Sequence, residues 1–115
     1  MTQKMKTQPQ PMPPAKEITK EKLEKYVTLT HDAFQAARKA PQTQNTKDAR
    51  EKFLDTIQRY IADAQYFTKK GDWVTAFAAL NYALGWLDAG AALGLWKVSD
   101  SRLFAGVEDV SKRKQ

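Results

Sequence analysis

The pattern of apolar and polar positions is most distinctive in residues 73–96. This stretch is the most apolar part of the chain, with two uncharged polar side chains, Thr75 and Asn81, and one charge, Asp88. A helix on the surface of a bundle would show a continuous polar side. We therefore expect a helix over residues 72–93 that is buried on more than one face and that forms the core of the domain.

Two segments before this stretch show apolar residues at steps of three and four, which is the period of an amphipathic helix. The first is predicted to run over 19–40, with Thr19 as its N-cap and Pro41 directly beyond its end. The second is predicted to run over 46–70, with Thr46 as its N-cap. Its predicted buried stripe consists of Ala49, Phe53, Ile57, Tyr60, Ala64 and Phe67. We expect its charged residues on the outer side: Lys47, Asp48, Arg50, Glu51, Lys52, Asp55, Arg59 and Asp63.

The dipeptide Gly71–Asp72 places a helix stop directly before a helix start. Glycine suits the left-handed position after a helix, and aspartate is a good N-cap. The two signals together predict an antiparallel helical hairpin. Gly94 is the corresponding stop signal for the last helix, and Gly90 and Gly94 together predict a weak C-terminal end.

The predicted fold class is therefore all-α, a three-helix bundle with a short packed C-terminal extension. We expect residues 1–17 to be a disordered tail rich in Pro, Gln and Lys, because the segment has little to bury. The bundle should span 18–96, the extension 97–110, and a basic tail 111–115. Ser99 or Asp100 could cap a short turn in the extension.

One stripe of the last helix is small and polar. At 100° per residue, Asn81, Gly85, Asp88 and Ala92 share one line along the helix. Two interpretations stay open for Asp88: a structural hydrogen bond that fixes the position of the helix, or a site residue acting together with Asn81. Because small residues let helices approach closely, the stripe is also a candidate interaction surface. Three helices leave part of this helix uncovered, so the sequence predicts a homodimer.

Charge adds a second candidate surface. The formal net charge is +6, but residues 17–110 contain 13 basic and 13 acidic residues, so the excess lies in the two ends. The candidate nucleic-acid contacts are Lys112, Arg113 and Lys114, since basic tails bind nucleic acid weakly by releasing counterions. The alternative is that the tails keep a neutral body soluble.

The sequence gives little support for a metal site, a disulfide, a cofactor, an active site or a membrane span. There is no cysteine and His31 is the single histidine, so we expect no metal site and no disulfide. The sequence contains no nucleophile or phosphate-binding motif, so we expect no cofactor and no enzyme activity. We also expect no membrane span, because residues 73–96 are rich in Ala and Gly and Asp88 would cost about 2.5–3.5 kcal/mol to insert.

Several of these residues are also found together in a known family: Tyr60, Asp63, Ala64, Tyr66, Phe67, Gly71, Asp72, Ala76, Phe77, Ala78, Asn81, Tyr82, Gly85, Trp86, Leu87, Asp88, Ala89, Gly90, Leu93 and Gly94. On these residues the chain resembles the archaeal domain-of-unknown-function family 357. The resemblance implies an all-α fold and an archaeal, cytoplasmic setting, and it implies no activity. The hairpin around Gly71–Asp72 also looks like one tetratricopeptide unit, although an array would need about three.

The sequence thus predicts a non-catalytic helical module for protein–protein interaction, with an unidentified protein partner. The alternative is an accessory protein of a nucleic-acid machine, such as a ribosome or polymerase, tethered through the basic tails.

Overall fold

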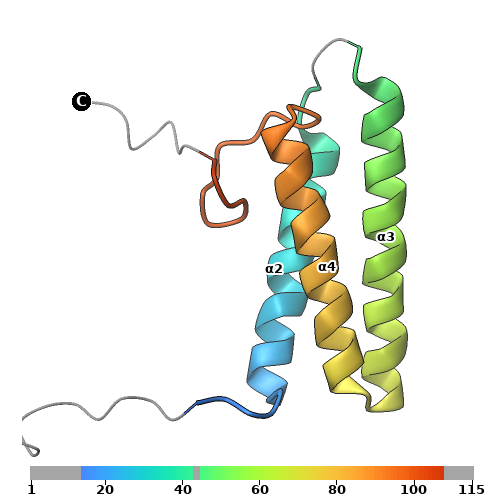
Figure 1. Cartoon of the computed structure of the whole chain (residues 1–115), viewed down its shortest axis with the longest axis vertical. Helices are drawn as coiled ribbons and strands as arrows, with labels where there is room; N and C mark the ends of the chain where they lie inside the picture. The colour runs from blue at the N-terminus through green and yellow to red at the C-terminus, as the bar shows by residue number, and fades with distance from the viewer. Residues whose placement is uncertain (1–13, 43–44, 108–115) are drawn as a thin grey trace, which may run out of the picture.

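The computed structural model describes residues 14–42 and 45–107. They form three helices, α2 (Lys20–Lys39), α3 (Lys47–Lys70) and α4 (Trp73–Ala92), and no strand occurs in these ranges (Figure 1). The predicted all-α three-helix bundle is confirmed, and each helix begins and ends within one residue of its predicted bounds.

Local hydrogen bonds explain where two of the helices begin. The Thr19 side chain accepts from the Lys22 amide at 3.1 Å, and the Asp72 side chain accepts from the Thr75 amide at 3.1 Å. Thr46 occupies the N-cap position of α3, but its side chain accepts no capping hydrogen bond. The predicted N-cap position is thus the observed one, although the helix begins there without the side-chain hydrogen bond.

The turn between α3 and α4 follows the prediction for Gly71–Asp72. Gly71 has a φ of 83°, in the left-handed region that glycine adopts without a steric penalty. The Asp72 amide then donates to the Phe67 carbonyl oxygen at 2.9 Å, which satisfies the end of α3. Because α4 begins at the next residue, the two helices must run antiparallel side by side.

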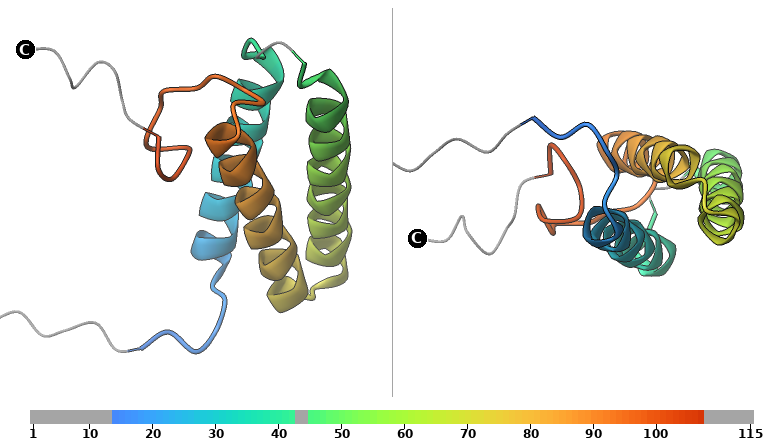
Figure 2. Two further views of the ribbon diagram at one scale, coloured as in Figure 1. Left: turned by 45° about the horizontal axis from the view of Figure 1, so that its top comes forward. Right: turned by 90° about the horizontal axis from the view of Figure 1, so that it is seen from below.

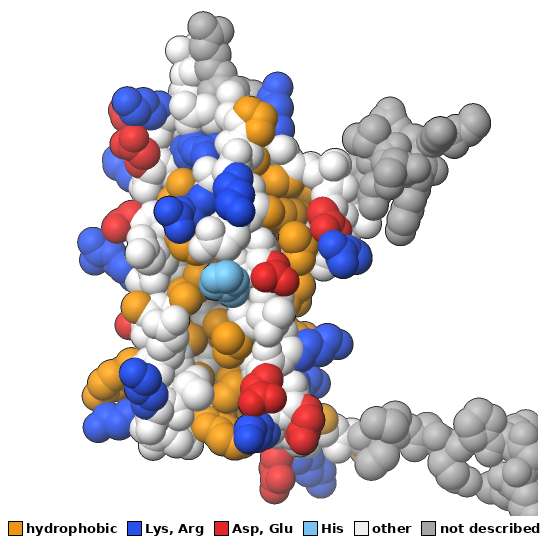
Figure 3. Space-filling model, turned by 180° about the vertical axis from the view of Figure 1, so that it is seen from behind, with side chains coloured by type: hydrophobic (Ala, Val, Ile, Leu, Met, Phe, Trp, Pro, Cys, Tyr) orange, Lys and Arg blue, Asp and Glu red, His pale blue; other side chains and the backbone are white. Residues whose placement is uncertain are grey.

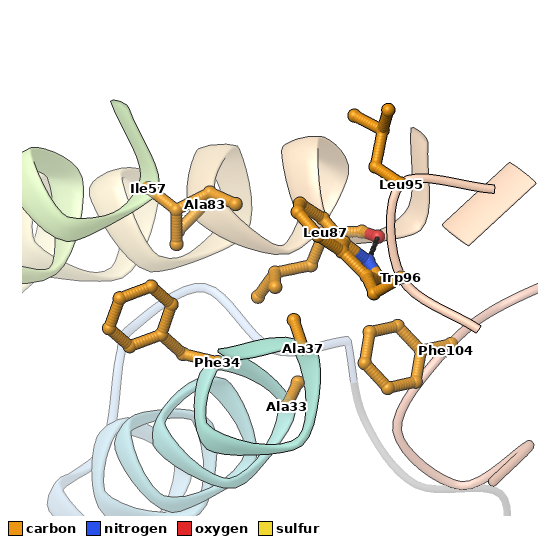
Figure 4. Close-up of a cluster of buried hydrophobic side chains, with 9 residues drawn as sticks. All are labelled: Ala33, Phe34, Ala37, Ile57, Ala83, Leu87, Leu95, Trp96 and Phe104. Carbon is orange, nitrogen blue, oxygen red and sulfur yellow. Dashed lines mark hydrogen bonds between the residues drawn. The ribbon is translucent and has the colours of Figure 1, made fainter. Parts of the chain in front are cut away.

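Helix α4 is the central element of the bundle. It packs against both α2 and α3, whereas α2 and α3 scarcely touch each other, as the view from below in Figure 2 shows. The main cluster of buried side chains (Figure 4) contains Ala33, Phe34, Ala37, Ile57, Ala83, Leu87, Leu95, Trp96 and Phe104. No helix in the described ranges is long and apolar enough to cross a membrane.

The end of α4 is built around Trp96, which is fully buried. Gly94 takes a φ of 78°, and the Leu95 amide donates back to the Gly90 carbonyl oxygen at 2.9 Å, so the chain reverses. The Trp96 ring then lies against Gly90, and its Nε1 donates to the Leu87 carbonyl oxygen at 3.0 Å (Figure 4). Gly90, predicted to weaken the helix, makes room for this ring.

The described part of the C-terminal extension, residues 97–107, forms turns without a helix. Asp100 organises one of them: its side chain accepts from the Arg102 amide at 2.9 Å. Phe104 is buried in the main core, and the Asp88 carboxylate accepts from the Ala105 amide at 2.9 Å. The extension is therefore attached to α4 by both an apolar side chain and a charged acceptor.

Arg50 corrects an expectation about the outer side of α3. Its guanidinium is half-buried and donates to three carbonyl oxygens, those of Ala40 at 2.8 Å, Arg38 at 2.9 Å and Leu95 at 3.0 Å. These carbonyls belong to the end of α2 and to the turn after α4, where the helices leave backbone acceptors unpaired. Arg50 thus joins three parts of the chain and is not a solvent-facing charge.

Candidate interaction site

The four residues of the predicted polar stripe differ in their exposure to solvent. Asn81, Gly85 and Ala92 are exposed, whereas Asp88 is half-buried. The Asn81 side-chain amide donates to the Phe77 carbonyl oxygen of its own helix at 2.9 Å, and Asp88 bonds to Ala105. Asp88 and Asn81 do not contact each other, so the stripe does not form a joint polar site. The geometry of Asp88 is that of the structural interpretation.

Around the exposed members of the stripe lies a broader surface, which we call the α4 outer face. It consists of the outward-facing residues Val74, Ala78, Asn81, Tyr82, Gly85, Ala89, Ala92 and Leu93. Its large side chains are far from buried: Val74 is 69%, Leu93 64% and Tyr82 55% exposed. In Figure 1, α4 lies in front and no described segment covers this face. None of the eight side chains is charged.

Two open hollows border this face where α4 meets α3. The first has a volume of about 320 Å³ and is lined by Phe53, Asn81, Tyr82, Gly85, Trp86 and Ala89. The second, also about 320 Å³, is lined by Tyr60, Asp63, Phe67, Thr75, Ala78, Ala79 and Tyr82. Tyr82 lines both hollows and therefore separates them. Asp63 is the one charged side chain among these lining residues.

Aromatic side chains give this region its shape. Phe53 meets Trp86 edge to face with ring centroids 4.8 Å apart, and Tyr60 meets Tyr82 in the same way at 4.6 Å. Burial, together with the neighbouring Tyr82 hydroxyl and the Asp63 charge, raises the pKa of Tyr60 above its ordinary value. The phenol therefore stays protonated, and uncharged, over the whole physiological pH range.

Most side chains that line the two hollows are apolar or aromatic. Tyr82 is the one titratable side chain that lines the first hollow, and Tyr60 and Asp63 join it in the second. Within residues 14–42 and 45–107, no group of three His, Cys, Asp or Glu side chains could hold a metal ion. The candidate nucleic-acid contacts Lys112, Arg113 and Lys114 lie outside the described residues.

A second groove lies on the opposite side of the bundle, between α2 and α3. It has a volume of about 290 Å³ and is lined by Val27, Thr30, His31, Ile61, Ala64, Gln65, Thr68, Lys69 and Leu80. Figure 3 shows this back face, with apolar side chains visible between the two helices. The groove exists because α2 and α3 both lean on α4 and leave a gap between themselves.

Sequence reasoning missed part of the surface around the hollows. Phe53, Tyr60 and Phe67 belong to the predicted buried stripe of α3, but the structure leaves them only half-buried. Their spacing of seven residues places them on one line of the helix, which was the available signal. That signal could not tell a side chain facing the interior from one at the edge of the bundle.

Comparison with known proteins identifies one match. Residues 25–96, more than half of the chain, match the family DUF357, described as a protein of unknown function. The matched range includes all of α3 and α4 and both hollows. No curated protein and no solved structure matches the chain.

Proposed function

The chain belongs to DUF357, a family of proteins of unknown function, and from its surface we propose that it is a non-catalytic helical module for protein–protein interaction. The observation that carries the proposal is the α4 outer face together with the two hollows beside it. A contiguous exposed apolar face of this kind is typical of interaction sites.

The composition of the surface supports a protein partner. Protein interfaces are rich in Tyr, Trp and Phe and poor in charge at their centre. Tyr82, Trp86 and Phe53 line the first hollow together with the small residues Gly85 and Ala89. A large apolar side chain of a partner could therefore enter between them without removing a charge from water.

The alternative is an accessory role in a nucleic-acid machine through the basic ends of the chain. Lys112, Arg113 and Lys114 are the residues that would make these contacts. Such binding would weaken steeply as salt is raised, because each neutralised phosphate releases counterions. Binding through the α4 outer face would depend little on salt, since that face has no charge.

The test is an affinity purification from native cells, with and without nuclease, comparing three tagged chains: wild type, Gly85→Glu and Ala62→Glu. A Cβ at Gly85 has no neighbouring atom within 4 Å, so Gly85→Glu fits the folded chain while placing a charge on the α4 outer face. Ala62 is exposed on α3 and lines none of the hollows described above, so Ala62→Glu adds the same charge elsewhere.

We expect a protein captured by wild type and by Ala62→Glu, but not by Gly85→Glu, whether or not nuclease is present. Capture that depends on nucleic acid and survives Gly85→Glu would favour the alternative. The archaeal, cytoplasmic setting implied by the family resemblance stays a prediction, as does the homodimer, which would cover the same face.

A further inference from the structure

We propose that the two hollows where α4 meets α3 bind a proline-rich segment of a partner protein, in the polyproline II conformation and with a basic residue beside its prolines. Two prolines that are three residues apart each fill one hollow, and Tyr82 lies between them. The inference rests on the proposed interaction role of the same surface, and it names the chemistry of the partner.

The spacing of the two hollows is the first argument. On α3, Phe53, Tyr60 and Phe67 follow one another at intervals of seven residues, so the gaps between them are about 10.5 Å apart. On α4, the first hollow is lined within 81–89 and the second within 75–82, and the midpoints of these ranges are about 10 Å apart. In a polyproline II helix, residues three apart lie on the same side at a distance of about 9.3 Å.

The side chains that separate the hollows favour this conformation over the other two that a bound segment can adopt. Tyr82 meets Tyr60 edge to face at 4.6 Å and is still 55% exposed, so it separates the hollows without leaving its own chain. An α-helix places side chains about 5–6 Å apart on one face, and the intermediate one would collide with Tyr82. A β-strand repeats about every 6.6 Å, which fits neither one hollow nor two.

The lining of the hollows suits proline rings. Phe53 and Trp86 line the first hollow, Tyr60 and Phe67 line the second, and Tyr82 lines both. Aromatic-lined grooves bind polyproline II segments well because the segment is already ordered before it binds. The carbonyl oxygens of such a segment have no internal hydrogen bonds. The indole N–H of Trp86 donates to no acceptor in the described part of the chain, so it can supply one donor.

Asp63 is the reason to expect a basic residue in the partner. Asp63 is exposed, lines the second hollow and takes part in none of the ion pairs that form within the described residues. It is the one charged side chain that lines either hollow. A cation beside the second proline therefore meets an opposite charge and no like charge, which an acidic or neutral segment would not gain.

Titration of the full ¹⁵N-labelled chain with the peptide PPAPPAPPR, followed by NMR, tests the proposal. We expect saturable shifts at backbone amides beside both hollows, with a Kd of about 10–500 µM, because the contact is small. The peptide QGAQGAQGR, which replaces each proline pair, should bind at least tenfold more weakly. No saturation up to about 2 mM peptide, equal binding of the two peptides, or shifts beside one hollow alone would overturn the proposal.

Two tyrosines provide a matched pair of variants. Tyr82 and Tyr66 are 55% and 56% exposed, but Tyr66 lies on α3 and lines neither hollow. We expect Tyr82→Ala to weaken binding of PPAPPAPPR at least tenfold and Tyr66→Ala to change it less than twofold. Circular dichroism shows whether both variants fold, and Gly85→Glu, which adds a side chain at the first hollow, should weaken binding as Tyr82→Ala does. Wild-type affinity in folded Tyr82→Ala or Gly85→Glu would overturn the proposal.

The basic residue has its own test. The peptide PPAPPAPPQ lacks the cation, and we expect it to bind wild type about two- to fivefold more weakly than PPAPPAPPR, the effect of one exposed ion pair. In Asp63→Asn the two peptides should bind alike. A preference for PPAPPAPPR that is absent in wild type, or that persists in Asp63→Asn, would overturn the assignment of Asp63.

The chain contains one pair of prolines with the same spacing, Pro11 and Pro14, followed by Lys16. A full chain with Pro11→Ala and Pro14→Ala that binds PPAPPAPPR at least tenfold more tightly than wild type would show that its own segment fills the hollows. That result would overturn a partner protein as the occupant, whereas equal affinity supports it.

These results are distinguishable from a failure of the proposed function. If PPAPPAPPR does not bind, but wild type captures a protein that Gly85→Glu does not capture, the interaction module stands with a partner of different chemistry. If every captured protein is unaffected by Gly85→Glu, the proposed function fails as well.

Discussion

Two glycines of α4, Gly85 and Gly90, provide a matched pair of substitutions with opposite expected effects. Both lie inside the helix, where replacing glycine by alanine stabilises by about 0.8–1 kcal/mol if space allows. At Gly85 an added Cβ meets no atom within 4 Å. At Gly90 it would lie 2.5 Å from Trp96 Cε2 and 2.6 Å from Cη2, and closer still to Cζ2.

The cost at Gly90 can be worked out from these contacts. Carbon atoms prefer separations of about 3.5–4.0 Å, so the ring would have to move by about 1 Å or more. Trp96 is fully buried and bonds to the Leu87 carbonyl oxygen, so it has no free direction to move in. Overpacking of about 1–3 kcal/mol and a weakened hydrogen bond of about 0.5–1.5 kcal/mol, less the gain in helix propensity, leave a net loss of about 1–3 kcal/mol.

Thermal and urea unfolding followed by circular dichroism measures both variants, at a concentration low enough that self-association adds nothing. We expect Gly85→Ala to raise Tm by about 4–8 °C, and Gly90→Ala to lower it by about 4–20 °C. Tryptophan fluorescence should change for Gly90→Ala, because the ring of Trp96 moves. A Gly90→Ala variant as stable as Gly85→Ala would refute the reasoning that Trp96 occupies the space beside Gly90.

Three further predictions concern the polar contacts. Arg50→Lys should lower the free energy of unfolding by about 2–4 kcal/mol in urea titrations, because one ammonium cannot reach three carbonyl oxygens in the way the planar guanidinium does; stability equal to wild type would contradict this. Asp88→Ala should speed hydrogen exchange at the Ala105 amide and lower Tm, while Asp88→Asn, which keeps an acceptor oxygen, should change both less; unchanged exchange in Asp88→Ala would argue against the contact. The raised pKa of Tyr60 means that its contribution to stability is present below about pH 10 and is lost as pH rises through its pKa in the folded state. In an NMR titration Tyr82→Phe should bring the pKa of Tyr60 part of the way back, since burial remains; a pKa that does not move would exclude the Tyr82 hydroxyl as a cause.

Much of the fold could be predicted because its signals are local. The apolar period of α2 and α3, the cap at Thr19 and the Gly71–Asp72 turn each depend on residues within one or two helical turns. Such signals are readable without knowing what lies elsewhere in the chain. The same holds for the central position of α4, since a helix that is apolar on several sides must be covered on more than one of them.

The candidate site was predicted less well. The stripe of Asn81, Gly85, Asp88 and Ala92 is a property of one helix, and a helical wheel cannot show which neighbour faces which edge. Asp88 accepts a hydrogen bond from the C-terminal extension, and Asn81 donates one to the backbone of its own helix. Tyr60 of α3, which is not part of the stripe, contacts Tyr82 beside the α4 outer face.

The sequence by itself therefore determined the three helices, their ends and the helix that had to be central, because those follow from propensity and periodicity. Only the tertiary structure decided which side chains were buried at the edges of the bundle. Arg50 looked like a surface charge until the carbonyl oxygens of Arg38, Ala40 and Leu95 were brought around it. Gly90 was expected only to weaken the end of the helix, but the structure places the Trp96 ring in the space beside it. The partners of Arg50 lie 10, 12 and 45 residues away in the sequence, and Trp96 reaches Gly90 only because the chain reverses after α4. A local pattern contains no information about contacts of this kind.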